Sequence, residues 1–212
     1  MAATPSTSRH VTKLETRICP QPASQSFTVS LPTFTLTVSK AGSGEGTVTG
    51  TGISCGADCS ETFNSGASVN LTAVSDPGST LTGWSGCDSL AASCTVTMNV
   101  NRTVTAKFSK DFDPITAGVT PVKALHITEL RDAINTLRSR NGLPAFSFGS
   151  APTAGVTEIQ AAHIRDLRSA LDAVYGVVKP GQKPSYTPIV PRQTVIEKAH
   201  IDEIRNAVRD VE

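Results

Sequence analysis

The chain has 212 residues and a formal net charge of +1, with 38% hydrophobic and 5% aromatic residues. This balance lacks the basic excess that nucleic-acid-binding proteins show, so no nucleic-acid partner is expected. No apolar run approaches the roughly 18 residues that a membrane-spanning helix needs, so no membrane insertion is expected. The length and composition favour one or two domains with modest cores.

Residues 1–33 are rich in Ser, Thr and Pro and show no helical periodicity. They lack the apolar core of a signal peptide, so either a signal was removed or the chain begins inside a longer precursor. Residues 27–31 alternate apolar and polar side chains before Pro32 interrupts them, which predicts a short strand. Because the segment looks unable to fold alone, we expect an extended segment that donates a strand to a neighbouring subunit. Cys19 is the odd cysteine and is a candidate for a bond between chains.

Residues 34–109 place apolar side chains at every second position, as in Phe34, Leu36 and Val38, with glycine-bearing turns such as AGSGEG and DPGS between the runs. Short runs of this kind, dominated by Thr and Val, predict a small antiparallel all-β module.

Four cysteines of this region form two close pairs, Cys55 with Cys59 and Cys87 with Cys94. Two disulfides are the simplest interpretation, and they predict an oxidising compartment. A zinc site made by all four thiolates is the alternative, although the usual CxxC spacing is absent. Disulfides also make physical sense here, because a domain of this size buries little apolar surface.

The segment from Leu36 to Phe108 resembles the divergent internalin B-repeat modules of secreted and cell-surface bacterial proteins. It contains G-x-G-x-V, C-x3-C, F-x-x-G-x-x-V-x-L-T-A, G-W-S-G-C and a final V-T-A-x-F. The resemblance implies a small β-module that serves as a spacer, stalk or adhesion element and carries no catalytic residues. It also implies that Trp84 is the core aromatic residue.

Residues 110–212 change to helical periodicity and contain an internal repeat. The segments TPVKALHITELRDAI, TEIQAAHIRDLRSAL and TVIEKAHIDEIRNAV place His126, His163 and His200 at a spacing of 37 residues. A fixed period of this size predicts an all-α domain of three tandem helical repeats, joined by extended crossovers. It resembles a module found at the C-terminus of large exported bacterial proteins.

Each helix is predicted to begin at a threonine N-cap, which is Thr120, Thr157 or Thr194. Gln160 and Glu197 then lie three residues later, where they would complete capping boxes in the second and third units. Pro121 suits the first helical turn of the first unit.

On a helical wheel, the three histidines lie inside the apolar stripe, and three arginines lie at its edge (Arg131, Arg168 and Arg205). An acidic residue two positions before each arginine faces elsewhere, so the arginine is expected to reach a neighbouring unit's acid or a loop carbonyl. We interpret both residue types as structural positions of the repeat. Two alternatives remain, a metal site shared by the three histidines and a surface groove that binds glycan or peptide.

Linker aromatics Phe146, Phe148, Tyr175 and Tyr186 are expected to fill gaps between the helices, although exposed aromatics would suit sugar binding. Replacing any repeat histidine with Ala should lower the thermal stability without abolishing a metal-dependent property.

No catalytic motif, metal site or cofactor fingerprint is found in the sequence. The fold class expected is therefore multidomain, β then α, and the function expected is that of a non-catalytic extracellular or cell-surface structural or adhesive protein. It would join other copies of itself, as in an extracellular polymer or filament, or other surface proteins. The alternative is a carbohydrate- or cell-wall-binding module that acts through the helical repeats.

Overall fold

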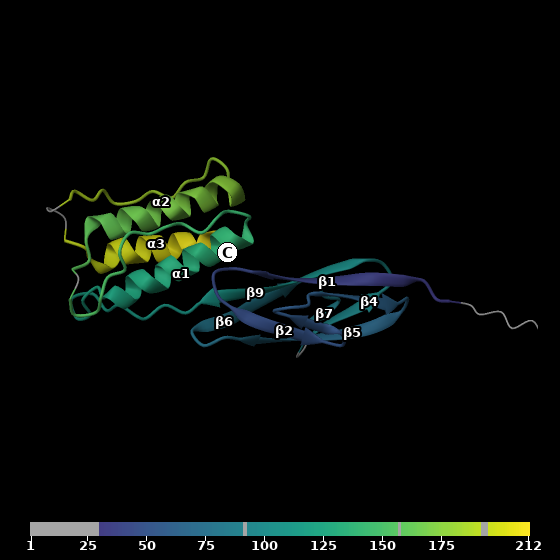
Figure 1. Ribbon diagram of the computed structural model, residues 1–212. Coiled ribbons are helices and arrows are strands. Elements are labelled where there is room, and N and C mark those ends of the chain that lie inside the picture. Colours follow the sequence, from purple (N-terminus) through teal and green to yellow (C-terminus); the bar gives the residue numbers. More distant parts are fainter. Residues whose placement is uncertain (1–29, 91–92, 157, 192–194) are drawn as a thin grey trace, which may run out of the picture. The chain divides into compact units, whose positions relative to one another are not determined.

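The computed structural model describes residues 30–90, 93–156, 158–191 and 195–212, and it shows an all-β module followed by three helices (Figure 1). The predicted fold class is thereby confirmed. Several sequence predictions lie outside the described residues: Cys19, residues 27–29 of the predicted strand, and the caps at Thr157 and Thr194. The strands are β1 (Thr33–Ala41), β2 (Gly46–Gly50), β3 (Ile53–Cys55), β4 (Ser60–Asn64), β5 (Ala67–Ser75), β6 (Ser79–Ser85), β7 (Ser89–Leu90), β8 (Cys94–Met98) and β9 (Arg102–Lys110).

Two sheets form the β-module, with strand orders β4-β1-β9-β6 and β3-β2-β5-β8-β7. All neighbouring strands run antiparallel except β1 and β9, which pair in parallel with Val38 opposite Val104. The alternating apolar residues of both sheets meet in a single core, as the period-two pattern predicts. Phe108 is the fully buried aromatic of this core, whereas Trp84, expected from the resemblance to be the core aromatic, is partly buried and packs against it from β6.

Two disulfides link the close cysteine pairs, Cys55 to Cys59 and Cys87 to Cys94. In each bridge one sulfur belongs to the core, because Cys55 and Cys94 are buried while their partners pack at its margin. The bridges therefore fasten the ends of β3 and β8 to the loops beside them.

Gly46 begins β2 where the backbone passes the ring of Phe108. A Cβ atom at this position would lie 2.3 Å from Phe108 Cε1 and 2.7 Å from the carbonyl oxygen of Val74. Both distances are far below contact, so the glycine is required by close approach and not by its backbone angles.

Gly46→Ala should destabilise the β-module by about 1–3 kcal/mol, because the buried ring has to leave its place. Denaturant unfolding followed by tryptophan fluorescence measures the change. Gly56→Ala is the matched control, because a Cβ at Gly56 meets nothing within 4 Å, and it should change the free energy of unfolding by less than about 0.5 kcal/mol. Equal effects of the two substitutions would contradict the packing argument.

The three helices are α1 (Ala124–Arg140), α2 (Ala161–Val178) and α3 (Lys198–Asp210). None of the helices in the described ranges is long and apolar enough to cross a membrane. They begin later than the sequence predicted, since the N-cap residues are Lys123, Gln160 and Glu197. Thr120 and Pro121 lie before α1, so their predicted places in the first turn are wrong. Gln160 and Glu197 are therefore the N-cap residues themselves, and they do not occupy the third helical position of a capping box as the sequence predicted.

The helices run in the same direction, and each crossover returns along the bundle (Figure 1). The last part of one helix contacts the second half of the next: Arg138 of α1 donates to the Ala170 carbonyl of α2 (2.9 Å), and Tyr175 Oη of α2 donates to the Ala207 carbonyl of α3 (3.0 Å). Every pair of helices is in contact, including α1 with α3, and all three share one hydrophobic core. The three repeats therefore form a closed bundle and not an open stack.

Candidate functional site

The three repeat histidines occupy the third position of their helices and cap them. His126, His163 and His200 are only 0%, 9% and 5% exposed. The Nδ1 atom of each ring accepts the main-chain N–H of the cap residue three positions earlier, at distances of 3.0, 3.1 and 3.0 Å. In return, the histidine's own N–H donates to the carbonyl of that cap residue. An Nδ1 atom that accepts a hydrogen bond carries no proton, so each ring is neutral in this arrangement.

Charged groups stand beside these rings. His126 Nε2 lies 3.0 Å from Asp113 Oδ2, which precedes α1. Burial lowers the pKa of His163, the positive charge of Arg131 on α1 lowers it further, and Asp166 on the same helix partly offsets both effects. The neutral ring of His163 is thus favoured by its surroundings as well as by its hydrogen bond.

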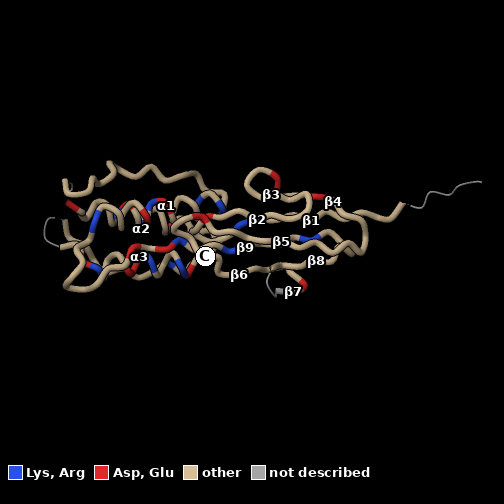
Figure 2. Tube along the Cα trace, turned by 90° about the horizontal axis from the view of Figure 1, so that it is seen from below, with Lys and Arg blue, Asp and Glu red and all other residues tan. Residues whose placement is uncertain are grey.

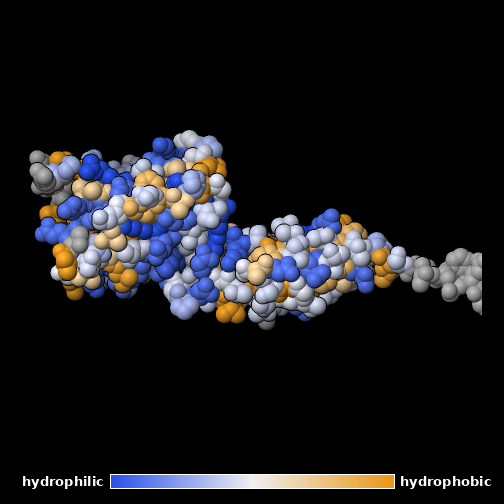
Figure 3. Space-filling view, viewed as in Figure 1, coloured by the Kyte–Doolittle hydropathy of each residue, from blue (hydrophilic) through white to orange (hydrophobic). Residues whose placement is uncertain are grey.

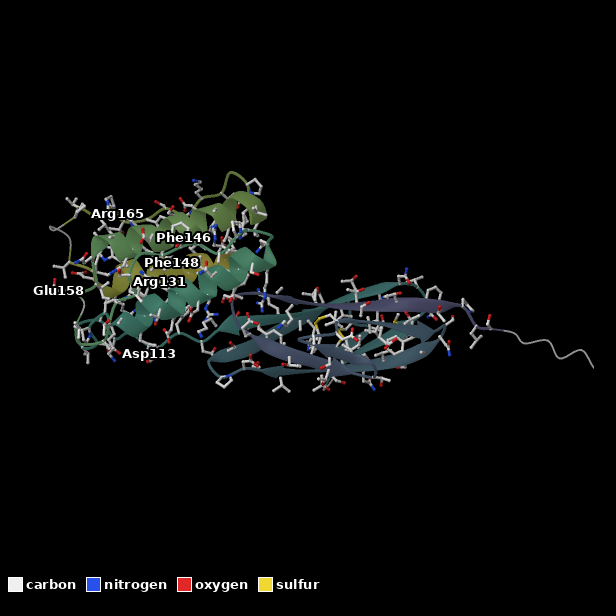
Figure 4. The ribbon with its side chains drawn as sticks, viewed as in Figure 1. Asp113, Arg131, Phe146, Phe148, Glu158 and Arg165 are labelled. Carbon is white, nitrogen blue, oxygen red and sulfur yellow. A yellow bond between two sulfur atoms is a disulfide. The ribbon has the colours of Figure 1, made fainter. Side chains whose placement is uncertain are left out.

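The three repeat arginines clamp the crossovers. Each guanidinium donates to a main-chain carbonyl of the segment that leads into another helix: Arg131 to Ser150 (3.3 Å), Arg168 to Thr187 (2.8 Å) and Arg205 to Asp113 (2.7 Å). Each also lies over an aromatic ring of that segment: Phe148 (5.1 Å to the centroid), Tyr186 (4.7 Å) and Phe112 (5.1 Å). Figure 4 labels Arg131 beside Phe146 and Phe148. Charge-assisted hydrogen bonds and ring stacking act together on each crossover.

Acidic residues of another helix complete the clamps of Arg168 and Arg205. Glu203 on α3 accepts Arg168 Nη2 at 3.1 Å and the main-chain N–H of Thr187 at 3.1 Å. Glu129 on α1 lies 3.6 Å from Arg205 Nη2 and accepts the N–H of Asp113.

The third clamp returns from α3 to the first unit, so the set of three clamps closes on itself. Both partners foreseen for the arginines, loop carbonyls and acids of another unit, are present in this arrangement.

The aromatic and acidic partners outside the helices were only partly foreseen. Asp113 was considered only as part of an Asp-x-Asp pair in a linker, and Phe112 was not singled out, although an aromatic residue stands 14 or 15 residues before each repeat histidine. That second periodicity was the signal that would have found Phe112. Phe146, Phe148 and Tyr186 pack against the bundle core while partly buried, and Tyr175 is buried.

A shared metal site is not formed by the histidines. In the parts of the chain that the structure describes, no three His, Cys, Asp or Glu side chains lie close enough together to hold a metal ion. Each histidine instead serves the start of its own helix.

One surface pocket lies at the beginning of α3. It has a volume of about 690 Å³ and is bounded by residues 117–122 on one side and 196–202 on the other. Its wall combines apolar groups such as Val119 and Ile196 with the charges of Lys198 and Asp202. Acidic and basic residues are interspersed along the helices (Figure 2), and apolar side chains are scattered over the face seen in Figure 3.

The outer strands of the β-module are protected against pairing with another chain. On β4, the N–H of Ser60 donates to Asp58 Oδ1 (3.3 Å) and that of Thr62 donates to Glu61 Oε1 (2.7 Å). Strand β6 carries a bulge between Leu81 and Gly83, and β3 and β7 are only 3 and 2 residues long. Carboxylates, bulges and short strands all blunt sheet edges, so among the described residues we find no long open edge.

The comparisons with known proteins concern the β-module. Residues 34–112 match the family model of the divergent InlB B-repeat domain. The match spans nearly all of β1 and the remaining strands, and it ends before α1. It indicates a bacterial surface-associated module. Searches of curated proteins and of solved structures found no match to the chain.

Proposed function

We propose that this protein is a non-catalytic structural or adhesive component of a bacterial cell surface, exposed outside the cell. The observation that carries the proposal is the match of residues 34–112 to a surface repeat domain. The two disulfides of that module support it, because such bonds persist in oxidising surroundings.

The histidines and arginines of the helical bundle support the same proposal. Their polar groups bind main-chain atoms and acids inside the bundle, as in the bond from Lys123 N–H to His126 Nδ1 and from Arg205 to the Asp113 carbonyl. Groups held in this way stabilise a scaffold, and they do not converge on a space where a substrate would react.

The protected edge strands of the β-module limit how such a component could assemble with copies of itself. Strand donation by residues 1–33 to a second copy would need an open edge on its β-module, and the described edges are capped, bulged or short. We therefore infer that any strand donated by residues 1–33 pairs with another surface protein. We favour a spacer or adhesive role over a filament made of this chain alone.

A second candidate function is binding of a carbohydrate or cell-wall polymer by the helical repeats. The pocket at the start of α3 favours it, since it offers both apolar and charged walls to a ligand.

Light scattering of the full chain with and without reductant, combined with sedimentation on purified peptidoglycan, separates the candidates. A monomer that does not sediment supports the spacer role, and large assemblies that Cys19→Ser disperses support polymerisation through Cys19. Retention on peptidoglycan that Val119→Asp abolishes supports the second candidate. A hydrolytic or transfer activity lost in a single-residue variant would overturn the non-catalytic proposal.

A further inference from the structure

The capping histidines have a chemical property that an ordinary cap lacks. A cap formed by Ser, Thr, Asn or Gln accepts its hydrogen bond at any ordinary pH, whereas a histidine ring gains a proton near neutrality. Here the accepting atom is Nδ1, which is the atom that the added proton would occupy. Protonation would turn that acceptor into a donor that faces another donor, the N–H of the cap residue.

Burial increases the effect of each proton. The three rings lie at the edge of the bundle core and are nearly inaccessible to water. A charged ring there loses its hydration, and the surrounding side chains do not compensate for the lost free energy. The bundle is also closed, so loosening the start of one helix disturbs the clamps on both neighbours.

The charged groups that face the rings differ between units. His163 faces Arg131 from α1 and Asp166 from its own helix. In the repeat, the corresponding groups for His200 are Arg168 of α2 and Glu203 of α3, which bind each other. His126 instead contacts Asp113, whose carbonyl binds Arg205 from α3.

These surroundings make His163 the most acid-sensitive of the three positions. The positive charge of Arg131 opposes a charged His163 ring, and among the described residues no carboxylate forms an ion pair with that ring as Asp113 does with His126. Because the pKa of His163 is lowered on folding, this group stabilises the bundle fully above about pH 6.5, the ordinary histidine value, and the stabilisation is lost as the pH falls below it.

We propose that the three capping histidines form an acid-sensitive lock, which holds the helical bundle closed at neutral pH and releases the helix starts when the rings take up protons, with the largest loss of stability at His163. Opening exposes the apolar stripe of each helix to solvent. The β-module contains no histidine in the described residues and is not part of the lock.

The test is native-state hydrogen exchange of the full chain at a series of pH values from 7.5 to 5, corrected for the intrinsic exchange rate. The amides at the start of α2 should lose protection by up to about tenfold per pH unit for each proton taken up. The amides of β5 and β9 in the same sample should keep theirs. Return to pH 7.5 should restore the protection.

A matched variant removes the proton and keeps the cap. Gln at the third helical position accepts the N–H of the cap residue without titrating, as in a capping box. His163→Gln should therefore stay folded at pH 7 and lose most of the pH dependence at the start of α2. Replacing all three histidines with Gln should remove the pH dependence at all three helix starts.

Two results would overturn the proposal. One is equal protection of the helix starts at pH 7 and pH 5 in the unaltered chain. The other is an unchanged pH dependence in His163→Gln and in the triple variant, which would assign the effect to carboxylates such as Asp113 or Asp166. If the triple variant fails to fold, the single variant decides.

Discussion

Reduction of both disulfides should unfold the β-module while the helical bundle keeps its structure. The bridges span 4 and 7 residues of sequence, and closing loops this short stabilises a fold by roughly 2 to 2.5 kcal/mol each. Their sum, about 4–5 kcal/mol, is comparable with the whole stability of a small domain. The helical bundle contains no cysteine and has its own core, so reductant should leave it folded.

The chain provides separate signals for its two parts. Trp84 is the single tryptophan and lies on β6, so its fluorescence reports the β-module alone. Helical circular dichroism reports the bundle. With reductant, the thermal transition seen by fluorescence should fall by at least about 15 °C, since 1 kcal/mol shifts a domain of this size by about 4–8 °C.

Cys19→Ser is the control for this experiment, because it removes the odd cysteine and leaves both bridges in place. It should melt as the unaltered protein does and respond equally to reductant. A fluorescence transition that reductant does not move would show that the β-module is held by its core alone.

The β-module was largely predictable from the sequence because its signals are local. Alternation at Leu36 and Val38 marks a strand with one face in the core, and both residues are buried there. Sequence spacing also paired the cysteines, since Cys55 and Cys59 are close enough to meet in nearly any turn. The sequence did not show which aromatic would be enclosed: Trp84 lies on an outer strand, and Phe108 lies on the central strand β9.

The starts of the helices were mispredicted for a specific physical reason. Thr120 suits an N-cap and stands before an apolar run, so a propensity rule places the helix start there. The structure uses the side chain of His126 for the same purpose, from inside the helix, and the helix begins at Ala124. A cap in which histidine is the acceptor leaves Lys, Gln or Glu at the cap position, which ordinary cap statistics disfavour.

Closure of the bundle could not be predicted from the sequence, because it depends on contacts between segments that lie far apart in the chain. The wheel placed Arg205 at the edge of the apolar stripe and predicted that it would reach another unit. It did not show that the unit is the first, whose Asp113 stands 92 residues earlier. That contact requires the crossovers to run back along the helices and the third helix to lie against α1.

Arg205→Ala should destabilise all three helices together, by about 2–4 kcal/mol. Arg205 donates to the Asp113 carbonyl, stacks on Phe112 and lies beside Glu129, and its loss leaves that partly buried carboxylate without its cation. A charge-assisted hydrogen bond contributes about 1.5–3 kcal/mol and a cation–π contact about 0.5–1 kcal/mol. Arg165→Ala is the matched control, because Arg165 is an exposed residue of α2, and it should change stability by less than about 0.5 kcal/mol.

The distribution of the loss tests closure itself. In an open stack each repeat depends on its nearest neighbours, so damage at the last unit frays α3 and leaves α1 protected. In a closed bundle the same substitution removes the contact between α3 and the first unit, so hydrogen exchange should speed up in α1 as much as in α3. Protection that falls in α3 alone would contradict the closed arrangement. Glu129→Gln added to Arg205→Ala should restore part of the stability, because it removes the carboxylate charge that Arg205 no longer compensates.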